Sequence, residues 1–209
     1  MTDIRRLPDT LVDRIAAGEV VERPAAAVKE LVENALDAGA HRIDIALDEG
    51  GMTSLRVTDD GRGMTADELR LAVRRHCTSK LGSGDLSAIN TLGFRGEALP
   101  SIASVSRFEI ASYPAGGDAW ALRIDHGAIR DDAPASLSRG TRVTVENLFE
   151  KIPARRKFLK SVRAEMGAIS DTVRRLAMAR ADVAFQMTHK GRTVLDAPAP
   201  ALAIDHDVD

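Results

Sequence analysis

The hydrophobic period of this chain changes from about 3.6 residues to 2 at Gly39, which restricts the fold to one that combines helices with strands. The segment from Pro24 to Ala38 is predicted to be a helix, because proline suits a first turn and Gly39 suits a C-terminal stop. Its expected buried stripe consists of Val28, Leu31, Val32 and Ala35. Beyond Gly39, apolar and polar residues alternate at 43–47 and 55–57 around Glu49-Gly50-Gly51, which predicts two adjacent antiparallel strands.

Further strands are predicted at 107–112, 119–125, 142–147, 183–187 and 192–195, separated by turn residues such as Asp125-His126-Gly127. A short helix is expected at 9–17, a capping box at Thr65 and Glu68 predicts a helix through about His76, and another helix is expected at 166–176. The helices flank the run of strands instead of alternating with them. We therefore expect an α+β fold, a two-layer α/β sandwich with helices on a mixed, mostly antiparallel sheet, and not a doubly wound sheet.

Composition excludes several classes of protein. Apolar residues make up 44% of the chain and charged residues 29%, so disordered and fibrous proteins are excluded, and 3% aromatic residues predict an aliphatic core. Cys77 is the only cysteine, which excludes an intrachain disulfide and a cysteine-rich metal site. With no apolar run near the ~20 residues of a membrane helix and no signal-peptide core, we expect a cytoplasmic protein without membrane contact.

A polar stripe lies on the predicted helix 24–38. Glu30, Asn34 and Asp37 fall within about 60° of one another at 100° per residue. One interpretation is a solvated helix face. The other is a carboxylate that accepts a proton beside an amide oxygen that holds Mg²⁺.

Two glycine-containing motifs add to this stripe. The first follows the end of a predicted strand and reads Asp59-Asp60-Gly61-Arg62-Gly63-Met64. One interpretation is a simple strand-to-helix turn. The other is a carboxylate that accepts the exocyclic amine of adenine, beside glycines that let a ligand approach the backbone closely. Gly93-Phe94-Arg95-Gly96-Glu97-Ala98-Leu99 ends a long segment from Cys77 and opens a predicted helix. It is either an ordinary helix start or a set of free N–H groups that binds phosphates, and its spacing fits neither a Walker A loop nor a dinucleotide fingerprint.

Taken in order, these motifs resemble the GHKL (Bergerat) ATPase family, and within it the MutL DNA mismatch repair proteins. The resemblance covers almost the whole chain. The strings that carry it are Ala16-Ala17-Gly18-Glu19-Val20, Glu30-Leu31-Val32-Glu33-Asn34-Ala35-Leu36-Asp37-Ala38-Gly39-Ala40, Asp59 to Met64, Arg75-His76-Cys77-Thr78-Ser79-Lys80, Gly93 to Leu99, Gly140-Thr141 and Pro153-Ala154-Arg155-Arg156-Lys157-Phe158-Leu159.

The resemblance implies a role for each matched residue, with ATP and Mg²⁺ as cofactors. Glu30 would orient and deprotonate the attacking water, and Asn34 would hold Mg²⁺. Asp59 would accept the adenine amine hydrogen, with Thr141 helping through water. A lid that nucleotide orders would cradle the phosphates. The implied nucleotide-binding residues are Asn34, Asp37, Asp59, Gly61, Gly63, Met64, Thr78, Ser79, Lys80, Leu92, Gly93, Phe94, Arg95, Gly96, Glu97, Ala98, Leu99 and Thr141.

The resemblance also implies parts outside this sequence. Family members carry a second lobe that supplies a lysine to the γ-phosphate, and a C-terminal domain that dimerises and in many members is a nuclease. We expect an N-terminal arm at 1–22, an ATP-binding domain at 23–196 and a tail or linker at 197–209, with slow hydrolysis and no nicking activity. The family often has Asp-Asn-Gly where this chain has Asp59-Asp60-Gly61, which places an additional negative charge near the expected nucleotide.

The stretch from Lys151 to Arg163 has six cations and no acidic residue, although the whole chain has 29 Lys and Arg against 31 Asp and Glu. It is either a solvated surface or a sequence-independent contact with the DNA backbone, which the resemblance favours. The candidate DNA-binding residues are Arg155, Arg156, Lys157, Lys160 and Arg163.

Three hypotheses follow. The first is an ATPase lobe that couples lid ordering and self-association through the arm to mismatch repair, with a mismatch-recognition protein as partner. The second is a nucleotide-gated interaction module without measurable catalysis, and the third is a purely DNA-binding domain. Measuring both the binding and the turnover of ATP separates the first two hypotheses.

Overall fold

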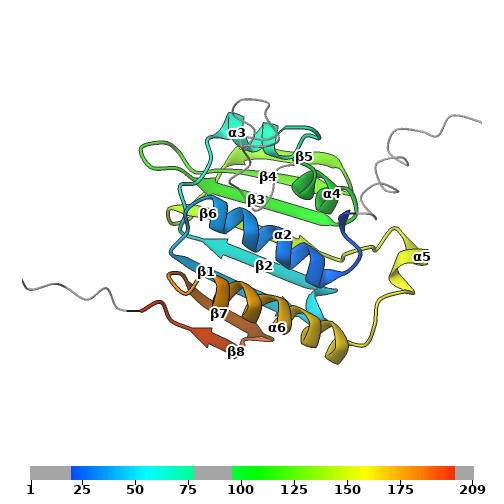
Figure 1. Ribbon diagram of the computed structural model, residues 1–209. Helices are drawn as coiled ribbons and strands as arrows, with labels where there is room; N and C mark the ends of the chain where they lie inside the picture. The colour runs from blue at the N-terminus through cyan, green and yellow to red at the C-terminus, as the bar shows by residue number, and fades with distance from the viewer. Residues whose placement is uncertain (1–19, 78–95, 201–209) are drawn as a thin grey trace, which may run out of the picture.

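The computed structural model describes residues 20–77 and 96–200, and in these residues eight strands form one sheet with the order β5-β4-β3-β6-β2-β1-β7-β8 (Figure 1). Neighbouring strands are antiparallel except β1 and β7, which are parallel. The sheet is therefore mixed and mostly antiparallel, as the sequence predicts. The strands are β1 Arg42–Asp48, β2 Ser54–Asp59, β3 Arg107–Tyr113, β4 Trp120–Asp125, β5 Ala128–Pro134, β6 Gly140–Glu146, β7 Ala184–His189 and β8 Arg192–Ala197.

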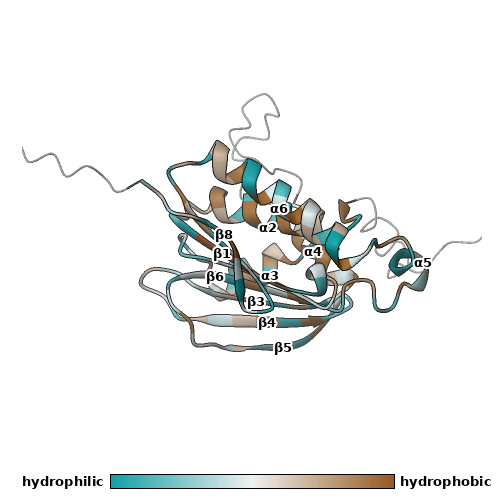
Figure 2. Cartoon of the chain, turned by 90° about the horizontal axis from the view of Figure 1, so that it is seen from below, coloured by the Kyte–Doolittle hydropathy of each residue, from teal (hydrophilic) through white to brown (hydrophobic). Residues whose placement is uncertain are grey.

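Helices cover one face of this sheet and make the second layer (Figure 2). Helix α2 lies between α4 and α6 and packs against both, while α3 packs against β4. The helices are α2 Pro24–Asp37, α3 Ala66–Ala72, α4 Ala98–Ser104, α5 Pro153–Arg156 and α6 Val162–Ala179, with a 3₁₀ turn η1 at Glu49–Gly51. No helix within the described ranges has both the length and the apolar character needed to cross a membrane.

The core lies between the two layers. The predicted stripe of α2 is buried, as are the alternating residues Ile43, Ile45 and Leu47 of β1. The aliphatic core is confirmed, and three phenylalanines, Phe108, Phe149 and Phe185, join it. Burial of aliphatic surface on both layers is what holds α2 against the sheet.

The structure corrects several boundaries. Helix α3 begins at the predicted Thr65–Glu68 capping box but ends at Ala72, not near His76, because Val73 leaves helical geometry and His76 has a φ of 60°. The sequence analysis missed β5, which is exposed along nearly its whole length and so has no buried alternation. It also missed the four-residue helix α5. The helix expected at 9–17 lies outside the described residues.

Candidate functional site

Asp59 ends β2 on the face of the sheet that carries the helices. Its Oδ1 accepts a hydrogen bond of 2.9 Å from the backbone N–H of Gly61, and the backbone N–H of Thr141 donates to the same carboxylate. Burial outweighs these two hydrogen bonds and raises the pKa of Asp59 to about 6. A partly buried carboxylate held by two backbone donors is a fixed acceptor for a ligand that supplies an N–H group.

The turn after Asp59 is fastened to the ends of two other strands. The backbone N–H of Met64 donates to Ser112 Oγ over 2.8 Å, and that oxygen lies 3.0 Å from Gly140 O and 2.9 Å from Thr141 Oγ1. Gly63 has a positive φ of 72°, whereas Gly61 does not and is needed for close packing: a Cβ there would lie 2.9 Å from the Cβ of Ala38.

The C-terminal end of α2 meets this turn. The backbone N–H of Arg62 donates to Ala38 O over 3.0 Å, one residue beyond the helix. Asn34 and Asp37 lie within the last turn of α2 and are partly buried, and Glu30, whose side chain is 31% exposed, lies one turn earlier. The structure thus brings the polar stripe of α2 and the Asp59 turn to one end of the sheet.

The start of α4 forms the next part of this region. Gly96 is packed against the carbonyl of Cys77, since a Cβ at Gly96 would lie 2.5 Å from that oxygen. The carboxylate of Glu97 lies 2.8 Å from His76 Nδ1 and 3.6 Å from a guanidinium nitrogen of Arg75. Ala98 and Leu99 begin α4, which packs against α2. The other proposed phosphate contacts lie outside the described residues: Thr78, Ser79, Lys80, Leu92, Gly93, Phe94 and Arg95.

Asp60 has a structural role that the sequence analysis did not foresee. Its Oδ1 accepts hydrogen bonds of 2.8 and 2.9 Å from the backbone N–H groups of His41 and Arg42, just before and at the start of β1. Both contacts use one acceptor oxygen, which aspartate and asparagine share. The departure from Asp-Asn-Gly therefore preserves the contact that joins the turn to β1.

The residues that hold Mg²⁺ would come from α2. In the described part of the chain no cluster of three or more His, Cys, Asp or Glu side chains has metal-ligand geometry. Mg²⁺ in nucleotide sites is held by one or two protein oxygens together with phosphates and water, so a single amide oxygen from Asn34 fits this requirement.

Glu165 of α6 is a buried acid that no motif or spacing in the sequence singles out. It is fully buried, and its carboxylate accepts from Arg23 Nε at 3.0 Å and from the backbone N–H of Lys160 at 2.9 Å. Arg23 is the N-cap residue of α2. This ion pair connects the helix that carries Glu30 to the end of the basic stretch.

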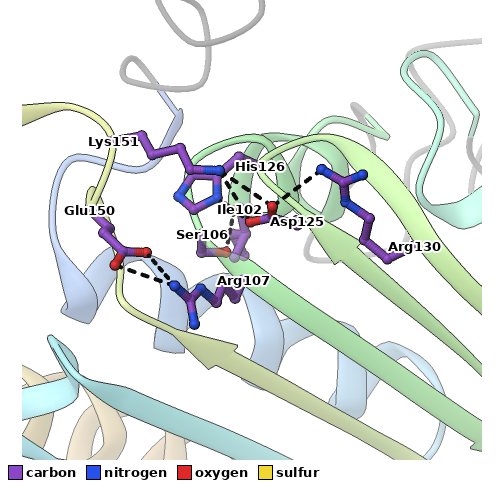
Figure 3. Close-up of polar contacts among 8 residues, drawn as sticks. All are labelled: Ile102, Ser106, Arg107, Asp125, His126, Arg130, Glu150 and Lys151. Carbon is purple, nitrogen blue, oxygen red and sulfur yellow. Dashed lines mark hydrogen bonds and ion pairs between the residues drawn. The ribbon is translucent and has the colours of Figure 1, made fainter.

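The predicted DNA-binding residues lie in and after α5, at the right of the molecule in Figure 1. Arg156, Lys157, Lys160 and Arg163 are exposed, while Arg155 lies over the ring of Phe149. Figure 3 shows the neighbouring Lys151 at Asp125, which also contacts His126 and Arg130. The hydrogen bond with His126 and the nearby Lys151 lower the pKa of Asp125 to about 2.

Comparisons with known proteins agree with this geometry. The family model described as histidine kinase-, DNA gyrase B-, and HSP90-like ATPase matches residues 22–155. The DNA mismatch repair protein MutL of Sphingopyxis alaskensis is 63% identical over 193 residues, which are 92% of this chain and 32% of that protein. MutL of Rhizorhabdus wittichii is 59% identical over 196 residues, 93% of this chain and 33% of that protein. The chain spans about a third of the length of these curated relatives.

Solved structures show the same similarity. The Aquifex aeolicus MutL ATPase domain complexed with ADP has a TM-score of 0.73 and 29% identity, covering 88% of this chain and 66% of that one. The N-terminal domain of a DNA repair protein has a TM-score of 0.78 and 28% identity, covering 91% of this chain and 57% of that one. The chain therefore belongs to the histidine kinase-, DNA gyrase B- and HSP90-like (GHKL) ATPase family, and its sequence and fold match the ATPase region of MutL DNA mismatch repair proteins.

Proposed function

We propose that this chain binds ATP between α2, the Asp59 turn and the start of α4, and that it hydrolyses ATP slowly as the nucleotide-dependent part of a mismatch repair protein. The observation that carries this proposal is the partly buried Asp59 carboxylate, held by two backbone N–H groups beside the end of the helix that bears Glu30 and Asn34. The ADP complex of the similar Aquifex aeolicus domain supports the choice of ligand.

Each residue has a defined task in this proposal. Asp59 accepts a hydrogen from the adenine amine, and Gly61 and Gly63 let the base lie against the turn. Glu30 orients the attacking water and accepts its proton. Asn34 would hold Mg²⁺, which when bound supplies neutralisation of phosphate charge. Phosphoryl transfer depends mostly on such positioning and charge neutralisation.

The proposal extends to the remaining expected contacts. Asp37, Met64 and Thr141 lie around the base and ribose end, and Gly96, Glu97, Ala98 and Leu99 lie at the phosphate end. Ordering of a lid by nucleotide, with self-association through the N-terminal arm and contact with a mismatch-recognition protein, would transmit the bound state.

Glu30→Ala tests the catalytic assignment. Because a general base contributes ~10²–10⁴ to a rate, this variant of the full-length protein should lose that factor in ATP turnover. It should still bind: a hundredfold excess of a non-hydrolysable ATP analogue with Mg²⁺ over its Kd should stabilise it by about 2.7 kcal/mol in a thermal-shift titration.

Glu33→Ala is the matched control, because Glu33 is on the same helix but pairs with Lys29 at 2.7 Å. Equal turnover by Glu30→Ala and the wild type would refute the role of Glu30. Binding without any turnover in the wild type would favour the nucleotide-gated interaction module. A titration without any thermal shift would contradict the nucleotide site.

We also propose that the exposed cations of the segment 155–163 bind the DNA backbone without sequence preference. Their support is local charge: the segment 151–163 has six cations and no acid in a chain whose net charge is −2. Such binding is electrostatic and therefore depends steeply on salt concentration.

A further inference from the structure

We infer that Ser112 is a positioning residue for base recognition: it takes up the hydroxyl hydrogen of Thr141, so that Thr141 presents only lone pairs to the nucleobase. This inference rests on the proposed nucleotide site. Ser112 belongs to β3, has no exposed surface and is absent from every motif by which the sequence suggested the site.

Three residues on adjacent strands form a row across the sheet. Thr141 of β6 is the register partner of Asp59 in β2 on one side and of Ser112 in β3 on the other. Directly paired residues of antiparallel strands have their side chains on the same face of the sheet. Asp59, Thr141 and Ser112 therefore share the face that carries α2 and α4.

The hydrogens in this row can be assigned from donor chemistry alone. Ser112 Oγ receives the backbone N–H of Met64 at 2.8 Å and lies 3.0 Å from Gly140 O, which can only accept. The single hydroxyl hydrogen of Ser112 therefore goes to Gly140. The 2.9 Å contact between Ser112 Oγ and Thr141 Oγ1 then needs the hydrogen of Thr141.

This assignment fixes what the site offers to a base. The ionised Asp59 carboxylate is an acceptor, and Thr141 Oγ1, with its hydrogen used, is also an acceptor. Two neighbouring acceptors that both face the C6 substituent of a purine complement an amino group, which has two hydrogens to donate, and oppose a carbonyl oxygen, which has none. Ser112 thus contributes to selecting a 6-aminopurine over a 6-oxopurine without touching the base.

Ser112→Ala tests the inference through the ratio of two affinities, those of Mg-ADP and Mg-IDP, whose base has a carbonyl in place of the amine. The variant frees the Thr141 hydrogen to donate to that carbonyl. We expect ADP affinity to fall about threefold to tenfold, the range for one hydrogen bond, and IDP affinity to fall less or rise, so that the ratio narrows.

Ser106→Ala is the matched control, because Ser106 is equally buried but donates to Ile102 O within its own local segment. It should leave the ratio unchanged. The double variant Ser112→Ala/Thr141→Val should have the same ratio as Thr141→Val alone, since Ser112 acts through Thr141.

Thr141→Ser keeps the hydroxyl and should keep the wild-type ratio even if Ser112→Ala folds poorly. Equal losses of ADP and IDP affinity in Ser112→Ala would overturn the inference. So would additive effects of Ser112→Ala and Thr141→Val on the ratio of ADP to IDP affinity in the double variant. A ratio in Thr141→Ser equal to that in Thr141→Val would overturn it as well. Failure of the wild type to bind ADP would contradict the proposed function, and this inference with it.

Discussion

Two adjacent carboxylates at the end of β2 differ because their surroundings differ. Asp59 is partly buried on the face of the sheet that carries the helices, and this burial raises its pKa to about 6 even though two backbone N–H groups favour its charge. Asp60 is exposed and accepts from the N–H groups that open β1. At this scale the first acid is suited to ligand recognition and the second to joining two segments of backbone.

The raised pKa of Asp59 predicts a pH dependence of both stability and binding. Its folded pKa, about 6, exceeds the unfolded value of roughly 3.9, so the folded chain binds more protons between these values. The contribution of Asp59 to the free energy of unfolding therefore decreases as the pH rises through about 6. The proposed binding of nucleotide should show the opposite trend, because the adenine amine donates more strongly to the ionised carboxylate of Asp59. The affinity for nucleotide should therefore decline below pH 6.

Calorimetric titration of Mg-ADP between pH 5 and pH 8 measures this effect. Asp59→Asn should lower affinity at pH 7.5 by at least about tenfold, the value of a hydrogen bond to a charged group, and should flatten the profile. Asp60→Asn is the control and should retain the wild-type profile. If Asp59→Asn has the same pH profile of affinity as the wild type, Asp59 does not contact the adenine amine as proposed.

Helix α2 is fixed at both of its ends, and this is what positions Glu30 and Asn34. At its start, Arg23 pairs with the buried Glu165 of α6, and just beyond its end, Ala38 O accepts from Arg62 of the Asp59 turn. Glu165 also accepts from the backbone of Lys160. The same buried acid therefore connects α2, α6 and the end of the basic segment.

Removing Glu165 should destabilise the fold strongly. Glu165→Ala leaves the Arg23 guanidinium without its partner at a partly buried position, and breaking such a pair costs about 3–5 kcal/mol of unfolding free energy. Urea unfolding followed by circular dichroism measures the change. The control is Glu150→Ala, which removes a partly exposed acid paired with Arg107 at 3.3 Å and should cost under about 1 kcal/mol. Equal costs for the two variants would contradict a clamping role for Glu165.

On the scale of the whole molecule, opposite charges are nearly balanced but unevenly distributed. The net charge is −2, yet the segment 151–163 gathers six cations at one end of the two-layer sandwich, beyond the sheet (Figure 1). We therefore expect any long-range attraction of a polyanion to act at this end of the molecule and not over the whole surface.

A salt series of duplex DNA affinity tests this distribution. The double variant Arg156→Glu/Lys157→Glu should bind more weakly. The negative slope of log affinity against log salt concentration should become shallower by about 2, since each lost phosphate contact removes about 0.9 from its magnitude. Arg174→Glu/Arg175→Glu makes the same change of charge on α6, away from the segment, and should alter the slope much less. An unchanged slope in the first variant would reject the segment as the DNA contact.

Local elements followed from local sequence patterns. Pro24, the apolar stripe and Gly39 delimit α2, and alternation around Glu49-Gly50-Gly51 produces the β1–β2 pair, because these signals lie within a few residues of one another. The strand β5 was not predicted, because an exposed edge strand buries no alternating set of side chains and so has no alternating hydrophobic pattern. Resemblance to a known family suggested Glu30, Asn34 and Asp59, and the structure adds how the helix and the turn that carry them meet.

The sequence by itself determined the composition of the two layers and the ordered set of nucleotide motifs, since both depend on near neighbours in the chain. Only the tertiary structure decided which strands pair, including the parallel contact of β1 with β7, and which side chains support the site. Ser112 bonds to a residue 48 positions away and Glu165 to one 142 positions away. Contacts at such separations leave no periodic signal, because they are fixed by strand register and helix packing.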